Sequence, residues 1–112
     1  MKLDRLSPLE KNILKQLWPN KQLIVREIYT VLKRRQKVAL TSIAVALDRL
    51  YTKKLVDRTI KKGPGGLRYL YFPKKTKEEF ERSIVHETVD KLVETFGSTA
   101  LSYFNQRFAK KK

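Results

Sequence analysis

The sequence predicts a mainly α-helical fold with one small β-hairpin, and three observations lead to this prediction. First, apolar residues recur at helical spacing in three consecutive segments of the amino-terminal half. Second, two short segments rich in valine, isoleucine and tyrosine flank a glycine-rich tip, which is a hairpin pattern. Third, a long carboxy-terminal segment carries an apolar residue at every fourth position, as one face of a long helix does.

The first two expected helices are amphipathic. The first runs from about Pro8 to Trp18, because Ser7 can cap its start and Glu10, three residues later, can complete a capping box. After a break that contains proline and asparagine, apolar spacing indicates a second helix that begins near Val25. This helix is expected to end among the cations at residues 33–35.

The third expected helix, from about Thr41 to Lys54, precedes the hairpin. The expected strands are residues 55–61 and 67–72, and the tip at residues 63–66 is ringed by lysine and arginine. Three helices followed by a hairpin with a cationic tip are the order of a winged helix-turn-helix. We therefore expect residues 1–75 to form a DNA-binding domain of this class.

The remaining residues, 76–112, are expected to form a helical dimerisation region. A long helix begins at Thr76, Gly97 stops it, and Ser98 caps a last helix. The apolar stripe has to be buried, and a twofold partner is the economical way to bury it. The expected dimer-interface residues are Phe80, Ile84, Thr88, Leu92, Phe96, Leu101, Phe104 and Phe108.

Two alternatives remain for this stripe. The helix could fold back onto its own domain instead of pairing with a second chain. It could also lie on a membrane, but its polar face is acidic and anionic lipids would repel it. The acidic residues on that face are Glu78, Glu79, Glu81, Glu87, Asp90 and Glu94.

Charge favours a nucleic-acid partner. The chain of 112 residues has a formal net charge of +15. Residues 1–75 hold 19 Lys and Arg against 5 Asp and Glu, whereas residues 76–112 hold 7 against 6. A localised positive field attracts polyanions, because neutralised phosphates release their counterions. Duplex DNA is the leading partner, an anionic membrane is second, and a charge that serves only solubility is the plain alternative.

The residues expected to contact DNA lie on the third helix and on the hairpin. Hydroxyl groups at the start of the helix can bond phosphates or bases, and small apolar side chains beside them can touch a thymine methyl group. Cations near the hairpin tip can contact the backbone or enter the minor groove. The candidates are Thr41, Ser42, Ala44, Val45, Arg49, Lys61, Lys62 and Arg68.

Each group of candidates has a structural alternative. Thr41 and Ser42 could only cap the third helix. Arg49, two turns into the helix, could contact a phosphate or form an ion pair with Asp48 or Asp57. The lysines of the hairpin could only protect an edge strand from aggregation.

Catalysis, cofactors and metals are not expected. The chain has no cysteine, which excludes disulfides and thiolate sites. His86 is the only histidine, and a solvated or interface role is favoured over a weak metal site with Glu87 and Asp90. No nucleophile–histidine–carboxylate grouping or cofactor motif is present. The start lacks the apolar run of a signal peptide and no segment is apolar enough for a membrane span, so we expect a soluble, cytoplasmic protein.

Several segments together resemble the penicillinase repressor family, which includes the methicillin-resistance and copper-transport repressors. The matching pieces are residues 6–10 with Trp18, residues 25–29, 41–43 and 47–50, and the end of the hairpin at 69–73. The resemblance implies a homodimer whose winged helices bind an operator dyad, and it places Thr41, Ser42 and Arg49 where the family contacts DNA. Val45 stands where the family often has a second threonine, and Lys54 where it commonly has a glycine.

The sequence therefore predicts a dimeric, sequence-specific transcriptional regulator that acts as a repressor. One alternative is a nonspecific nucleic-acid-binding winged-helix protein associated with chromatin or the ribosome. Another is a winged helix whose hairpin docks a second protein.

Overall fold

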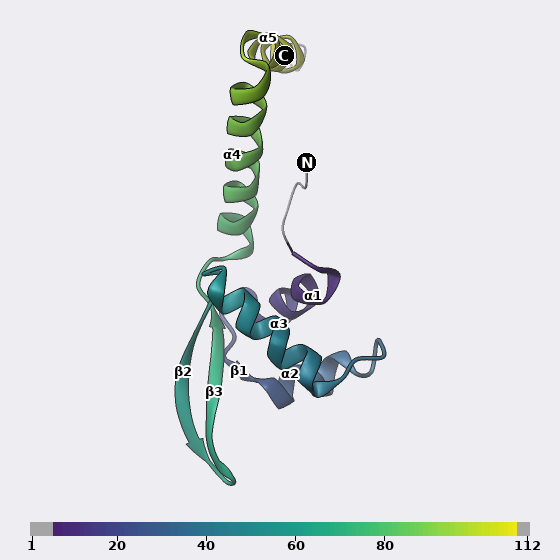
Figure 1. The fold of residues 1–112 in the computed structure, drawn as a ribbon, viewed down its shortest axis with the longest axis vertical. Helices are drawn as coiled ribbons and strands as arrows, with labels where there is room; N and C mark the ends of the chain where they lie inside the picture. The colour runs from purple at the N-terminus through teal and green to yellow at the C-terminus, as the bar shows by residue number, and fades with distance from the viewer. Residues whose placement is uncertain (1–5, 110–112) are drawn as a thin grey trace. The chain divides into compact units, whose positions relative to one another are not determined.

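The computed structural model describes residues 6–109 and confirms the predicted fold class. Residues 1–5 and 110–112, the outer ends of the two predicted regions, lie outside the described residues. The described chain forms two compact units, residues 6–80 and 81–109. The elements in order are α1 (Pro8–Leu17), β1 (Leu23–Ile24), α2 (Val25–Leu32), α3 (Leu40–Thr52), β2 (Val56–Gly63), β3 (Gly66–Pro73), α4 (Lys77–Phe96) and α5 (Ser98–Ala109) (Figure 1).

Helix α1 begins with the capping box that its sequence predicts. The Glu10 backbone N–H donates to the Ser7 hydroxyl at 3.1 Å, and the Ser7 backbone N–H donates to the Glu10 carboxylate at 3.1 Å. Trp18 is the C-cap, so the helix is one residue shorter than expected. Glu10 is also buried, and its carboxylate accepts from the Lys53 ammonium at 2.7 Å. This ion pair joins the start of α1 to the end of α3.

The core of the first unit lies where α1, α2 and α3 meet the base of the sheet. Helix α3 contributes Ile43, Ala46, Leu47 and Leu50, whose spacing places them on one helical face. Because these four side chains are buried, the opposite face of α3 is turned to solvent. The full core is Ile13, Leu14, Leu17, Ile28, Leu32, Ile43, Ala46, Leu47, Leu50, Val56 and Tyr71.

The sheet contains one short strand more than expected. Its order is β1-β3-β2, and both pairings are antiparallel. In β1, Leu23 pairs with Tyr71 and Ile24 with Leu70, so the two-residue strand ties the base of the hairpin to the helices. The hairpin strands are longer than expected, and their tips continue past β1 (Figure 1).

The tip of the hairpin is a two-residue turn at Pro64 and Gly65. The register closes with Gly63 opposite Gly66. Gly65 has a φ of +88°, which is the left-handed value that a turn with proline in front of glycine requires. The turn therefore requires a glycine at position 65, because other residues rarely adopt this φ.

Helix α3 ends in a motif that usually contains glycine. The Lys54 N–H donates to the Tyr51 carbonyl and the Leu55 N–H to the Leu50 carbonyl, each at 3.0 Å, which is the Schellman pattern. Lys54 occupies its left-handed position with a φ of 64°. Lys54 thus stands where the family commonly has a glycine, and its side chain makes this left-handed backbone conformation sterically unfavourable.

Helices α4 and α5 are separated by a glycine. Helix α4 starts with a capping box between Thr76 and Glu79, whose two hydrogen bonds are 3.0 and 3.1 Å long. Gly97, with a φ of +57°, ends it. The Gly97 carbonyl then accepts from the N–H groups of Ala100 and Leu101, so Gly97 rather than Ser98 caps α5 and the expected serine cap is wrong. No helix within residues 6–109 is long and apolar enough to cross a membrane.

Candidate nucleic-acid interface

The exposed face of α3 carries the predicted contact residues. Thr41, Ser42, Ala44, Val45 and Arg49 are all exposed, and the Val45 side chain is 51% accessible although it is apolar. They alternate with the buried residues at helical spacing, so the packing of the core fixes which side chains reach solvent. These five side chains therefore lie together on the solvent-exposed face of one helix.

The two hydroxyl residues are not helix caps. Helix α3 begins at Leu40, one residue earlier than expected, and its N-cap is Ala39, which has no side chain able to cap. Within residues 6–109 neither the Thr41 nor the Ser42 hydroxyl forms a hydrogen bond. The alternative that they only cap the helix is therefore wrong. Both hydroxyls lie in the first turn of α3, where the helix dipole favours an anion.

A hollow of about 330 Å³ lies between the start of α1 and the exposed face of α3. It brings the Arg49 side chain beside the hydroxyl residues and gives them an apolar neighbour in Leu9. A shallow hollow that combines hydroxyls, one cation and apolar carbon has the chemistry needed to contact a base edge or a sugar-phosphate unit. Its lining residues are Ser7, Leu9, Thr41, Ser42, Val45, Ala46 and Arg49.

Arg49 does not form the ion pairs considered for it. Asp48 pairs instead with Arg58, and an Asp57 carboxylate oxygen accepts from the Arg58 backbone N–H at 2.8 Å. Among the described residues no acidic partner for Arg49 is found. Its guanidinium is thus available to an anion from outside the chain.

Arg58 is the residue of this site that the sequence analysis missed. It lies on β2, and its guanidinium lies 3.9 Å from the centre of the Tyr51 ring and 4.2 Å from the centre of the Tyr69 ring. Its Nη1 is 3.1 Å from the Asp48 carboxylate. The Tyr71 side chain, and after it Asp48, raise the pKa of Arg58 above its ordinary value, so the group stays charged.

This cluster joins the hairpin to α3. Tyr51 and Asp48 belong to α3, Arg58 to β2, and Tyr69 to β3. A planar cation stacked on two rings and paired with a carboxylate restricts the movement of all three elements. This cluster could not be predicted from the sequence, because its four residues come together only when the hairpin packs on the helix.

The cations of the hairpin lie on both of its faces. Lys61 is directly opposite Arg68, and Lys62 is opposite Leu67. Side chains opposite each other share a face and neighbours along a strand alternate, so Lys62 points to the other face from Lys61 and Arg68. Both lysines are exposed, while Arg68 is half-buried and donates from Nη2 to the Pro64 carbonyl. The three cations thus surround the tip instead of converging on one side.

None of the predicted dimer residues is fully buried within the chain itself. No side chain of α4 or α5 within Lys77–Ala109 is buried, and apolar Phe96, Leu101 and Phe108 are 60%, 51% and 62% accessible. Phe80 is half-buried, because its ring packs against Trp18 with the ring centres 5.7 Å apart. The half-exposed members of the set are Phe80, Ile84, Thr88, Leu92 and Phe104.

His86 forms a pair on the surface of α4. Its Nδ1 lies 3.0 Å from the Asp90 carboxylate, and both side chains are largely exposed. The part of the chain that the structure describes contains no group of three side chains able to hold a metal ion.

Comparison with known proteins connects this geometry to a family. The sequence profile of the family described as penicillinase repressor matches residues 6–111. No curated protein matches the chain significantly.

Solved structures share the fold at low sequence identity. A possible transcriptional regulator from Methanosarcina mazei Go1 has a TM-score of 0.65 at 18% identity, covering 88% of this chain and 79% of its own. A PadR family regulator from Clostridium difficile R20291 has a TM-score of 0.55 at 20% identity, covering 80% and 98%. A PadR-like regulator from Bacillus cereus has a TM-score of 0.51 at 23% identity, covering 88% and 89%. At these identities the likeness concerns the fold alone.

Proposed function

Because the chain belongs to the penicillinase repressor family, and is thus a winged-helix transcriptional regulator and not an enzyme, we propose that it is a dimeric repressor that binds an operator dyad in duplex DNA. The observation that carries the proposal is the exposed face of α3. Its core face is filled, its outer face displays hydroxyl, small apolar and cationic side chains, and a cation-bearing hairpin flanks it.

In the proposed complex α3 enters the major groove. Thr41 and Ser42, in its first turn, donate to or accept from base edges or phosphates. Ala44 and Val45 contact thymine methyl groups, since exposed aliphatic carbon at a groove floor is the usual partner of that methyl. Arg49, which has no acidic partner among the described residues, binds a phosphate.

The hairpin is proposed to hold the backbone beside the groove. Lys61 and Arg68 on one face and Lys62 on the other give the tip cations in both directions. A tip of this kind can straddle a strand or enter the minor groove. The alternative role of the lysines, protection of an edge strand, is compatible with this one, because β2 is an edge strand of the sheet.

Dimerisation is proposed to occur through the apolar stripe of α4 and α5. A helix of 20 residues is about 30 Å long, and none of its side chains is buried in the chain. An apolar stripe of that length in contact with water is unfavourable, and a second copy would cover it. Pairing would set two α3 helices on half-sites about 34 Å apart, one turn of DNA.

Repression would then be steric. A dimer that covers a promoter dyad excludes polymerase without any chemical step by the protein. The proposed pairing region is nearly neutral and the winged domain is strongly basic, so these two tasks lie on separate parts of the chain.

The test is a footprint of the purified chain on the DNA upstream of its own gene, together with sedimentation of the free protein. A protected inverted repeat overlapping the promoter and a dimeric mass support the proposal. Equal competition by random duplex would favour the nonspecific binder instead, and absence of duplex binding at low salt would favour a protein-docking winged helix. A protected single half-site or a monomeric mass would contradict the dimeric dyad.

A further inference from the structure

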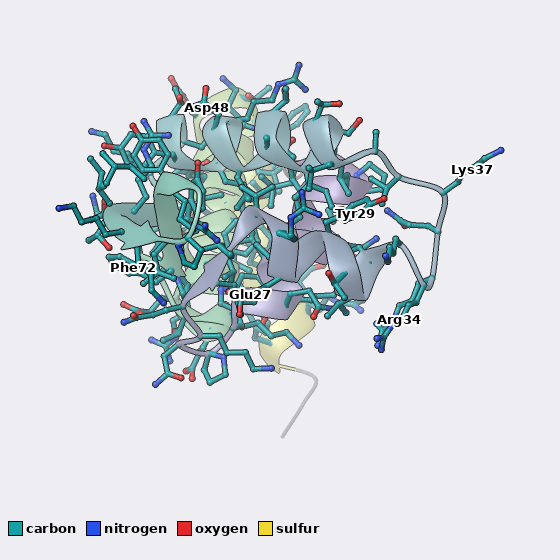
Figure 2. The ribbon with its side chains drawn as sticks, turned by 90° about the horizontal axis from the view of Figure 1, so that it is seen from below. Glu27, Tyr29, Arg34, Lys37, Asp48 and Phe72 are labelled. Carbon is teal, nitrogen blue, oxygen red and sulfur yellow. The ribbon has the colours of Figure 1, made fainter. Side chains whose placement is uncertain are left out.

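The turn between α2 and α3, residues 33–37, carries a dense group of cations outside the predicted contact set. Four of its five residues are basic, and all five are exposed. Figure 2 shows Arg34 and Lys37 pointing away from the helices into solvent. No ion pair of these four cations occurs within residues 6–109. The basic residues of this turn are Lys33, Arg34, Arg35 and Lys37.

The backbone of this turn is held in place. The Arg35 and Gln36 N–H groups both donate to the Leu32 carbonyl, at 3.0 and 3.1 Å, and continue the end of α2. The Gln36 amide oxygen accepts from the Asn12 side chain of α1 at 3.3 Å. The Lys33 ammonium lies 5.3 Å from the centre of the Tyr29 ring. A cationic group on a fixed base loses less conformational entropy when it binds than the same charges on a free segment.

The position of the turn in the fold suggests what it binds. It leads directly into α3, whose other end is joined to the hairpin through Arg58. A helix of 13 residues is about 20 Å long, and the major groove is about 12 Å wide. A helix that lies in the groove therefore brings its two ends toward the two sugar-phosphate backbones that border it.

We propose that residues 33–37 are a second phosphate-binding surface, which grips the DNA backbone at the amino end of α3 while the hairpin grips it at the other end. The proposal rests on the proposed duplex binding and adds a contact on the far side of the recognition helix. The partner is duplex DNA rather than a membrane, because the turn exposes no large apolar side chain that could insert into lipid.

The test is the salt dependence of binding to a labelled random-sequence duplex. The variant R34Q/R35Q/K37Q removes three charges and keeps Lys33, which contacts Tyr29. The control K15Q/K21Q/K74Q removes three exposed lysines of the same domain that lie outside α3, the hairpin and the turn. We expect the slope of log K against log salt to fall by roughly 2.7 in the first variant, about 0.9 per phosphate contact, and by less than about 1 in the control.

A charge-conserving variant and a cleavage experiment complete the test. R34K/R35K/K37R should restore the slope, since phosphate contacts here depend on charge. The chain has no cysteine, so K37C can carry a single DNA-cleaving reagent, which should cut at the border of the footprint. The cleavage measurement does not depend on a change in affinity, so it tests the proposal even if the triple variant folds poorly.

Three outcomes would overturn the proposal. Equal slope changes in the turn variant and the control would mean that net charge alone matters. Cleavage from position 37 that is absent or spread along the duplex would place the turn away from the backbone. A wild-type chain that binds no duplex at low salt would remove this proposal together with the proposed function, whereas the first two results leave the function of α3 intact.

Discussion

The guanidinium of Arg58 lies 3.9 Å from the centre of the Tyr51 ring, so β2 of the hairpin contacts α3 directly. The ion pair of Arg58 with Asp48, one helical turn before Tyr51, adds a second link between the same elements. Arg58 thus links β2 directly to α3, in addition to the β1–β3 pairing and the core packing at the base of the hairpin.

The first prediction concerns this side chain. R58K keeps the positive charge but loses the planar group that stacks on two rings. We expect faster hydrogen exchange of the β2 amides in the free protein and a duplex affinity lowered roughly three- to tenfold, because loss of one stacked cation loosens the hairpin. The slope of log K against log salt should not change. A slope lower by about one would mean that Arg58 itself contacts a phosphate.

The second prediction separates base reading from phosphate binding on α3, the proposed recognition helix. T41A/S42A should reduce the preference for the operator over random duplex and leave the salt slope nearly unchanged. R49A and K62A should each lower affinity for all sequences and reduce the slope by about one. Titrations at several salt concentrations measure both quantities. If R49A changed operator preference at a constant slope, Arg49 would be a base contact.

The third prediction concerns the left-handed residue after α3. K54G removes a side chain from a φ of 64°, which should raise the free energy of unfolding by about 0.5–1 kcal/mol. The matched control K74G, at an exposed position without positive φ, should leave stability unchanged or lower it slightly. Thermal unfolding of both variants provides the measurement. A destabilised K54G would show that the Lys54 side chain makes contacts worth more than the strain.

The fourth prediction concerns the buried carboxylate of α1. Burial by itself raises the pKa of Glu10, but hydrogen bonds from Lys53 and Ser7 outweigh it and leave the pKa below its ordinary value. Since a lowered pKa in the folded state stabilises the ionised form, this contribution is complete above the ordinary pKa of glutamate and is lost as pH falls through the folded value. Acid therefore removes the stabilisation that ionised Glu10 contributes to the folded state.

The variant E10Q tests this link. Glutamine keeps the capping box and loses the charged partner of Lys53, so stability near neutral pH should drop by about 1.5 kcal/mol. The difference between wild type and variant should shrink as pH falls below the range of ordinary glutamate. Urea unfolding at a series of pH values measures it. A difference that stays constant down to strong acid would contradict the assignment.

The fifth prediction addresses the proposed dimer. L92D places a charge in the apolar stripe of α4 and should convert the dimer to a monomer in sedimentation, because an unpaired charge cannot be buried cheaply in an apolar interface. E94K changes the charge by two at an exposed position of the same helix outside the stripe, and it should leave the dimer intact. Equal effects of the two variants would place the interface elsewhere.

Elements whose signals are local could be predicted from the sequence. The capping box at Ser7 and Glu10 and the apolar spacing of α3 depend on residues within a few positions of one another, and both are present. Strand β1 was missed, because two residues are too short for any periodicity and are held only by pairing with β3. The start of α3 was misplaced because hydroxyl residues are common caps, whereas here Ala39 precedes them.

The candidate surface could be predicted from the sequence only where a single element determines it. The exposure of Thr41, Ser42, Ala44, Val45 and Arg49 follows from the period of one helix. The partner of Asp48 could not be assigned, because Arg58 reaches it from a strand that follows a helix end and a turn. The division of the hairpin cations between two faces likewise depends on a register that the tip sets.

Trp18 is the only tryptophan of the chain, and its indole N–H donates to the Lys75 carbonyl at 3.0 Å while its ring lies against Phe80. The chain therefore contains an intrinsic fluorophore at the connection between the hairpin and the first turn of α4. Its emission wavelength and quenching will follow any loosening of that connection during the proposed binding to DNA, without an added label.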